Sequence, residues 1–172
     1  MRAAVAACVV LAACWTDSVP PPPQESSVPP TTPQPLVDVD VTMERTACFG
    51  RCPEYSVEIH HDGRVVWHGV KYVATIGTAT SRVSAMHLQQ LARAIQLIRF
   101  FDLDEGGHLP VTDSWASGMI CSDTSSATIT VRMNGVVHTA NDNHCEDHEP
   151  LEPLEELIDR IAGTAGLIGR SR

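Results

Sequence analysis

Cysteines are the residues of this chain with the most evident chemistry. Cys48 and Cys52 are separated by three residues, and a proline follows the second one directly. Two thiols so close together either serve metal or redox chemistry as a pair or close a short disulfide loop. Residues 55–60, just after them, alternate apolar and polar side chains as a β-strand does. Because no helix N-terminus is expected there to lower a thiol pKa, we favour a disulfide clip at the start of a hairpin.

A second group of potential ligands lies in residues 141–149, which read NDNHCEDHE. The candidate metal ligands are two carboxylates and two imidazoles, from Asp142, His144, Glu146 and His148. Imidazole and carboxylate are donors that divalent metals accept in proteins. The alternative is a solvated acidic loop that stabilises the N-terminus of the following helix. We favour the acidic loop, keep the metal site as the alternative, and expect no cofactor.

The first fourteen residues, MRAAVAACVVLAAC, indicate export. Arg2 is their only charge, and the apolar stretch 3–13 follows it. At 1.5 Å per residue this stretch reaches about 16 Å, which is too short to span a hydrocarbon core of about 30 Å and is typical of a signal peptide. It ends in the tetrapeptide LAAC, which resembles the bacterial lipoprotein box. The resemblance implies that residues 1–13 are removed and that Cys14 becomes a lipidated N-terminus.

A lipidated Cys14 implies a membrane as the expected partner of this chain, since each buried CH₂ of an acyl chain contributes about 0.8 kcal/mol. Trp15 follows Cys14 where an aspartate would indicate retention at the inner membrane. By the enterobacterial sorting pattern we therefore expect an outer membrane lipoprotein whose domain faces the periplasm or the cell surface. Residues 14–35 hold eight of the twelve prolines and are predicted to form a disordered, polyproline-rich tether.

Four of the six cysteines remain once the signal peptide and the lipidation site are set aside. An even number in an exported domain indicates two disulfides. Cys121 and Cys145 flank a predicted hairpin on its open side, so we favour a bridge between them beside Cys48–Cys52. Cross-links between the two pairs are the alternative.

Residues 36–166 are predicted to form one domain, followed by a C-terminal tail at 167–172. The chain carries 12 Lys and Arg against 21 Asp and Glu, a formal net charge of −9. An acidic surface repels nucleic acid, and the sequence shows no basic stripe, so nucleic acid is not expected as a partner.

Five segments have the alternation or the turn signals of β-strands. Residues 37–45 form the first, and two hairpins supply the others, at 55–60 with 64–73 and at 127–133 with 136–140. The hairpin turns are predicted at Asp62-Gly63 and Asn134-Gly135.

The register of the first hairpin follows from burial. A three-residue loop with Gly63 in the left-handed bulge position pairs Val57 with Trp67 and Ile59 with Val65. This choice gathers the apolar side chains on one face, whereas a strict two-residue turn does not. Because burial fixes strand register, we prefer the three-residue loop.

Two segments have helical spacing of their apolar residues. Residues 84–101 begin at Ser84, a suitable N-cap, and residues 151–162 end before Gly163. The apolar stripes are Leu88, Leu91, Ile95 and Ile98 in the first helix and Leu154, Leu157, Ile158 and Ile161 in the second. The order βββ-α-ββ-α predicts an α+β fold in which an antiparallel sheet, two hairpins plus one strand, carries the helices on one face.

The cysteine motif resembles two known families. Its Cys-x-x-x-Cys-Pro spacing is similar to the copper-chaperone motif of Sco-type proteins, but there the motif lies between a strand and a helix of a thioredoxin fold. A longer stretch, which begins MERTACFGRCPEY, resembles the uncharacterised bacterial family called domain of unknown function 6438. The matching residues are Glu44, Arg45, Thr46, Cys48, Phe49, Gly50, Cys52, Pro53 and Tyr55, then Val57, Ile59, Gly63, Val65 and Gly69. Met43 stands where the family pattern has leucine, and Trp67 replaces the commoner tyrosine. This resemblance covers residues 40–163, and it implies a fold and export but no activity.

These observations favour a lipid-anchored envelope protein that acts by binding or as a structural module rather than as an enzyme. The sequence has no Gly-x-Ser-x-Gly motif and no Gly-rich phosphate loop. An unidentified envelope protein is the expected partner. The alternative is a periplasmic metal-binding or thiol-redox protein that uses Cys48 and Cys52 or the loop from His144 to His148.

Overall fold

The computed structural model of the chain describes residues 37–109, 123–144 and 151–169. The expected signal peptide, the lipidation site Cys14 and the tether lie outside these residues. So do Cys121 and Cys145, whose pairing is not described, and the candidate ligands Glu146 and His148.

The described residues form six strands, three α-helices and a single 3₁₀ turn. The elements are β1 (Val39–Arg45), β2 (Glu54–Ile59), β3 (Arg64–Lys71), β4 (Gly77–Arg82), α1 (Ala85–Leu97), the 3₁₀ turn Phe100–Asp102, β5 (Ala127–Met133), β6 (Val136–Asp142), α2 (Glu152–Ala162) and α3 (Thr164–Ile168).

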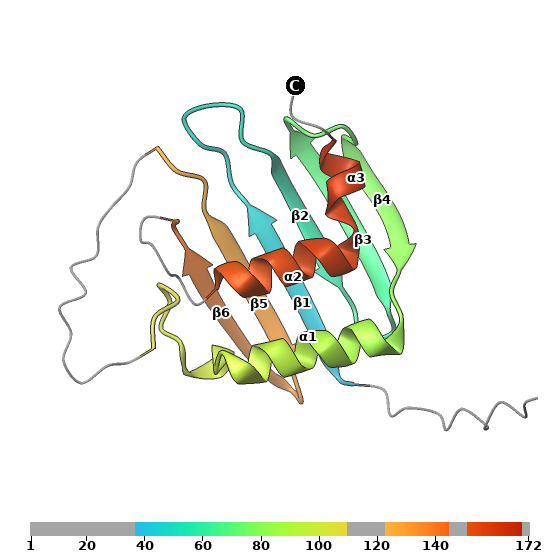
Figure 1. The fold of residues 1–172 in the computed structure, drawn as a ribbon, viewed down its shortest axis with the longest axis vertical. Helices are drawn as coiled ribbons and strands as arrows, with labels where there is room; N and C mark the ends of the chain where they lie inside the picture. The colour runs from blue at the N-terminus through green and yellow to red at the C-terminus, as the bar shows by residue number, and fades with distance from the viewer. Residues whose placement is uncertain (1–36, 110–122, 145–150, 170–172) are drawn as a thin grey trace, which may run out of the picture. The chain divides into compact units, whose positions relative to one another are not determined.

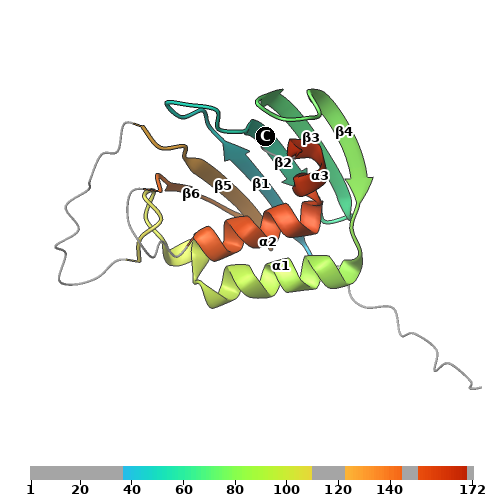
Figure 2. The ribbon, with the colours of Figure 1, turned by 45° about the horizontal axis from the view of Figure 1, so that its top comes forward.

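The strands form one antiparallel sheet in the order β4-β3-β2-β1-β5-β6. β1 lies in the middle and joins the two hairpins, because it pairs with β2 on one side and with β5 on the other. Helices α1 and α2 cross the same face of the sheet (Figures 1 and 2). The α+β fold with helices on one face is therefore confirmed.

The core lies between this face and the two helices. Alternate side chains of the strands point toward the helices, and β1 shows the alternation most clearly. The largest buried apolar side chains are Met43, Ile59, Trp67, Leu88, Leu91, Ile95, Phe100, Ile129, Leu151, Leu154 and Ile158. The predicted apolar stripes of both helices supply many of them, which is why the helices pack where the sequence places them.

Both hairpins have the predicted turns. Val57 pairs with Trp67 and Ile59 with Val65, so the preferred register of the first hairpin is confirmed. Gly63 has a φ of 82°, which a glycine adopts without a steric penalty. In the second hairpin Asn134 and Gly135 both have positive φ, as a two-residue type I′ turn requires.

Strand β4 is a correction to the predicted order, which had three strands before the first helix. β4 pairs with β3 along its whole length and forms one edge of the sheet. Its sequence, GTATSR, contains small and polar residues, and most of its side chains are exposed. Without large apolar side chains it has no alternation to detect, and its strand conformation depends on pairing with β3.

Helix α1 begins as predicted but ends earlier. The Ser84 side chain accepts a hydrogen bond from the backbone N–H of His87 at 3.3 Å, so the N-cap is confirmed. The helix ends at Leu97, four residues before the predicted end. Arg99 adopts a left-handed conformation with φ of 56°, and the 3₁₀ turn that follows places Phe100 in the core. The chain leaves the helical conformation here, and this change of direction lets the Phe100 ring reach the core.

Helix α2 spans nearly the predicted residues, and Gly163 ends it with a φ of 73°. The short helix α3 follows directly and was not predicted. It places Leu167 and Ile168 against the core, so the domain extends past the boundary predicted at residue 166. The carbonyl oxygens of these two residues accept backbone hydrogen bonds from Thr75 and Ala74, each at 2.9 Å, which ties α3 to the β3–β4 connection.

Gly69 allows the β3–β4 connection to fold back over β3. The indole N–H of Trp67 donates to the carbonyl oxygen of Thr75 at 3.0 Å, which holds the connection close to the strand. A Cβ atom at position 69 would overlap the Thr75 carbonyl oxygen and come within 2.9 Å of Val73 Cγ2. The glycine of the motif is therefore required by close packing of the backbone.

We expect Gly69→Ala to lower the free energy of unfolding by about 3 kcal/mol, at the upper end of the range for overpacking, because the added methyl group meets a backbone atom that cannot move aside. Gly166→Ala is the matched control: an added methyl group at this position in α3 would have nothing within 4 Å, and it should change stability by about 1 kcal/mol or less. Urea unfolding of both variants measures the difference, and equal stabilities would contradict this role of Gly69.

Candidate functional site

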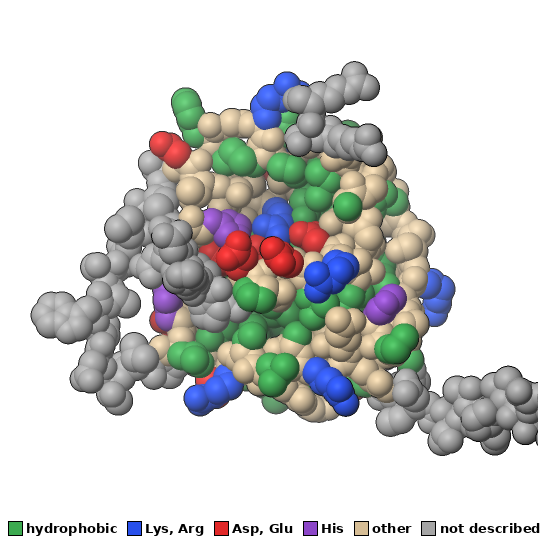
Figure 3. Space-filling view, in the orientation of Figure 1, with side chains coloured by type: hydrophobic (Ala, Val, Ile, Leu, Met, Phe, Trp, Pro, Cys, Tyr) green, Lys and Arg blue, Asp and Glu red, His purple; other side chains and the backbone are tan. Residues whose placement is uncertain are grey.

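A cluster of charged and polar side chains lies between the sheet and helix α2, and we call it the polar cluster. Figure 3 shows acidic side chains gathered over α2 on the helix-covered face, with basic and histidine side chains beside them. The members of the polar cluster are Arg45, Tyr55, Asp142, His144, Glu155, Asp159 and Thr164.

The sheet positions four residues in one row. Tyr55 of β2 pairs with Arg45 of β1, Arg45 pairs with Ala127 of β5, and Ala127 pairs with Asp142 of β6. Residues in such a cross-strand row point to the same face, here the face beneath α2. Ala127 is the small residue of the row, so it leaves space between the guanidinium and the carboxylate on its two sides.

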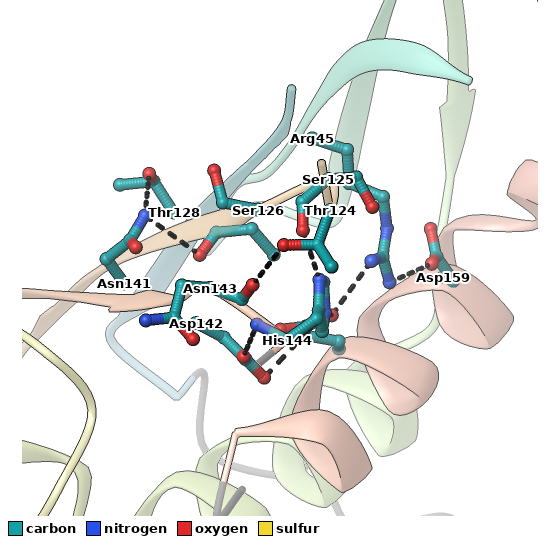
Figure 4. Close-up of polar contacts among 12 residues, drawn as sticks. Arg45, Thr124, Ser125, Ser126, Thr128, Asn141, Asp142, Asn143, His144 and Asp159 are labelled. Carbon is teal, nitrogen blue, oxygen red and sulfur yellow. Dashed lines mark hydrogen bonds and ion pairs between the residues drawn. The ribbon is translucent and has the colours of Figure 1, made fainter. Parts of the chain in front are cut away.

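Arg45 connects the sheet to helix α2. Its Nη1 lies 2.8 Å from Glu155 Oε2 and its Nη2 donates to Asp159 Oδ2 at 2.9 Å, as Figure 4 shows for Asp159. The two carboxylates are four residues apart on α2, so they lie on one face of the helix. Burial opposes the charge on Arg45, but its anionic partners outweigh this effect and hold its pKa above the ordinary value.

Tyr55 completes the guanidinium's contacts. Its hydroxyl accepts a hydrogen bond from Arg45 Nε at 2.9 Å and donates one to Asp159 Oδ1 at 2.7 Å. The hydroxyl of Thr164 also donates to Asp159 Oδ1, at 2.8 Å. The Tyr55 ring stacks on Trp67 with 4.6 Å between the ring centroids. Burial, helped by the nearby charge of Asp159, raises the pKa of Tyr55 above its ordinary value.

Asp142 and His144 enter the polar cluster from the end of β6. The backbone N–H of His144 donates to Asp142 Oδ1 at 2.7 Å, and His144 adopts a left-handed φ of 50°. Its Nδ1 lies 2.7 Å from the carbonyl oxygen of Ser125, and its Nε2 lies 3.0 Å from Glu155 Oε2. Figure 4 shows His144 beside Asp142 and close to Ser125, in the segment that leads into β5.

The polar cluster contains more acidic than permanently basic groups. Asp142, Glu155 and Asp159 supply three carboxylates, whereas Arg45 supplies the permanent cation. Burial raises the pKa of Glu155, although Arg45 and His144 act in the opposite direction. Burial works against a charged His144, but its hydrogen bond to Ser125 and the nearby Glu155 outweigh this and raise its pKa. A raised pKa means that the imidazole takes up a proton more readily, and a protonated ring would add positive charge beside these carboxylates.

The structure brings together two of the four ligands named from the sequence. Asp142 and His144 meet, whereas Glu146 and His148 lie outside the described residues. Glu155 and Arg45 were missed by sequence reasoning. The signal for Glu155 is a carboxylate on the buried stripe of α2, beside Leu154 and Ile158, and the signal for Arg45 is a cation at a core-facing position of β1.

The disulfide predicted between Cys48 and Cys52 is present. It closes the connection between β1 and β2, and β2 begins two residues later at Glu54. A strand rather than a helix N-terminus therefore follows the second cysteine, as the sequence indicated. Phe49, inside the closed loop, is 90% exposed.

An open antiparallel sheet with helices on one face and a charged cluster beneath one of them defines this chain as a small α+β domain. A family model described as "Domain of unknown function (DUF6438)" matches residues 39–162. The chain therefore belongs to this family, and the resemblance drawn from the cysteine motif is confirmed. A comparison with curated proteins found no match. Among the described residues, no helix has the length and apolar character to cross a membrane.

We expect Tyr55→Phe to lower the free energy of unfolding at pH 7 by about 1–3 kcal/mol, because it leaves Arg45 and Asp159 each short of one hydrogen-bond partner. The native pKa of Tyr55 lies above the unfolded value of about 10, so the folded state retains the proton longer. The Tyr55 hydroxyl therefore contributes to the free energy of unfolding below about pH 10, and this contribution decreases as the pH rises above about 10. Because Tyr55→Phe has no hydroxyl at this position, its free energy of unfolding should decrease less over the same pH range.

The chain supplies its own control for this experiment. Its other tyrosine, Tyr72, is 41% exposed, and Tyr72→Phe should change stability by about 0.5 kcal/mol or less. Chemical unfolding between pH 7 and pH 11 measures both variants. Identical pH profiles for the two variants would show that the Tyr55 hydroxyl has no special role.

Proposed function

We propose that this protein is a lipid-anchored component of a bacterial envelope whose α+β domain binds another envelope protein and is not an enzyme. The observation that carries the proposal is the loop closed by the Cys48–Cys52 disulfide, with Phe49 exposed inside it. This loop supports both parts of the proposal, export and binding.

The disulfide supports export. Such bonds persist in oxidising compartments and are rare in the cytosol. This agrees with the N-terminal signal pattern that ends at Cys14. Acyl chains at Cys14 would hold the protein at a membrane, and residues 20–35, if extended, would let the domain reach about 50 Å from it.

The exposed ring supports binding. Covering an aromatic side chain that is 90% exposed removes apolar surface from water, which favours association with a partner. Aromatic residues are also frequent anchors of protein interfaces. The disulfide limits the conformations of the loop, and the N–H of Gly50 donates to the carbonyl oxygen of Cys48 at 2.8 Å within it. A restricted loop loses less entropy on binding. The expected partner therefore has an apolar pocket for Phe49.

The surroundings of the two cysteines favour this structural use of the disulfide over thiol chemistry. In redox motifs a helix N-terminus beside the cysteine lowers its pKa and activates the thiolate. Here β2 follows at Glu54, so that stabilisation is missing next to Cys52. Within the polar cluster, Arg45, Tyr55, Asp159 and Thr164 hydrogen-bond to one another, which supports a structural role for these four side chains.

A photo-crosslinking amino acid at position 49 of the full chain, produced in cells, tests the binding partner. We expect a discrete crosslinked adduct from position 49 and none from position 97, where Leu97 is also 84% exposed but lies at the end of α1. Fractionation of the same cells tests the anchor, because Cys14→Ser removes the acylated sulfur and should move the protein out of the membrane fraction.

Each arm of this experiment has an outcome that contradicts its part of the proposal. Equal labelling from positions 49 and 97, or labelling from neither, contradicts binding through the disulfide loop. A Cys14→Ser protein that remains in the membrane fraction contradicts lipid anchoring at this cysteine.

A further inference from the structure

Two buried carboxylate oxygens of the polar cluster point to a ligand. The Asp142 side chain is fully buried and that of Glu155 is 2% exposed. Asp142 Oδ2 and Glu155 Oε1 have no hydrogen-bond partner in the described part of the chain. Buried carboxylate oxygens normally have hydrogen-bond partners, so two without one in a single cluster require an explanation. We propose that Asp142, His144 and Glu155 bind a divalent transition-metal cation of the zinc type.

The distances suit such an ion. One potential ligand atom from each of the three residues lies within 4.8 Å of the other two. His144 Nε2 is 3.7 Å from Asp142 Oδ2 and 3.0 Å from Glu155 Oε2. Tetrahedral zinc with bonds of about 2.0–2.1 Å needs ligand atoms about 3.3–3.4 Å apart. The Asp142 separation is close to this value. Glu155 Oε1, the oxygen without a hydrogen-bond partner, belongs to the carboxylate whose other oxygen lies 3.0 Å from Nε2, so a modest rearrangement of this carboxylate would bring Oε1 to the ion.

The imidazole is oriented as a metal ligand. His144 Nδ1 lies 2.7 Å from the carbonyl oxygen of Ser125, and a carbonyl oxygen only accepts, so Nδ1 carries a proton. In the neutral ring the lone pair is then on Nε2, the nitrogen that faces both carboxylates. Metal-binding histidines commonly donate their other N–H to a carbonyl or carboxylate in this way.

Arg45 leaves Glu155 free to bind the metal. Its guanidinium contacts Oε2, whereas Oε1 is the oxygen without a partner. The carboxylate can therefore keep Arg45 on one oxygen and bind the ion with the other. Charge favours the same arrangement, because three carboxylates face one permanent cation in the polar cluster and a divalent cation balances the remainder. One imidazole with two carboxylates suits zinc or a similar borderline metal better than calcium.

The site consists of described residues and does not depend on the envelope function proposed above. The alternative is that a protonated His144 serves as the counter-ion and that no metal binds. That alternative predicts the same contacts without a metal, so the two must be separated by measuring binding in the unaltered protein.

Calorimetric titration of the purified full chain with Zn²⁺, without reductant, tests the proposal. We expect one ion per chain and a higher melting temperature with Zn²⁺ than with a chelator. Asp142→Asn and His144→Gln should each weaken binding at least about tenfold. His61→Gln is the matched control, because His61 Nδ1 also lies 3.0 Å from a carboxylate oxygen, that of Asp40, but in an exposed position, and it should leave binding unchanged.

A second measurement keeps the test decisive if a variant fails to fold. In the unaltered protein labelled with ¹⁵N, Zn²⁺ should shift the Nε2 resonance of His144, assigned by its absence from His144→Gln. No stoichiometric binding below about 1 mM Zn²⁺, equal binding by the Asp142→Asn and unaltered proteins, or a shift confined to other histidines would each overturn the proposal.

Discussion

The guanidinium of Arg45 is the constraint on which the arrangement of this domain depends. A charge at a core-facing position is tolerated only where it is paired and hydrogen-bonded, and α2 and β2 supply what Arg45 requires. Glu155 and Asp159 are one turn apart on the helix, and Tyr55 is the cross-strand neighbour of Arg45. These contacts together determine where α2 lies along the sheet and which face of the helix points toward it.

The position of α2 in turn determines what the polar cluster can do. Because Arg45 holds one oxygen of Glu155, the other remains free to bind a ligand together with Asp142 and His144 at the end of β6. Structural and ligand-binding roles therefore meet in one carboxylate. The disulfide loop connects the end of β1 to the start of β2, next to the paired residues Arg45 and Tyr55. The same strand pair therefore holds both the loop and the polar cluster. A small domain thus carries two candidate binding features on one stable framework.

Local patterns and burial determine much of this fold, which is why the sequence predicts it. Alternation and two turn signals define both hairpins, including the register that pairs Val57 with Trp67. Strand β4 has no such alternation and depends on its partner strand. The site divides in the same way: Asp142 and His144 are close in sequence, so they could be named. Glu155 was not named, because its carboxylate on the buried stripe of α2 gains a role only through contacts with residues from distant parts of the sequence, which meet in a row that crosses four strands.

A double-mutant cycle on Arg45 and Glu155, with a chelator present, tests this dependence most directly. The free energies of unfolding of Arg45→Met, Glu155→Gln and the double variant are the quantities to measure. The account predicts that each single change costs up to about 3–5 kcal/mol, because it removes one charge of a largely buried pair and leaves the other without this partner, and that the double change costs clearly less than their sum. Losses that add to within about 0.5 kcal/mol would show that α2 does not depend on this ion pair.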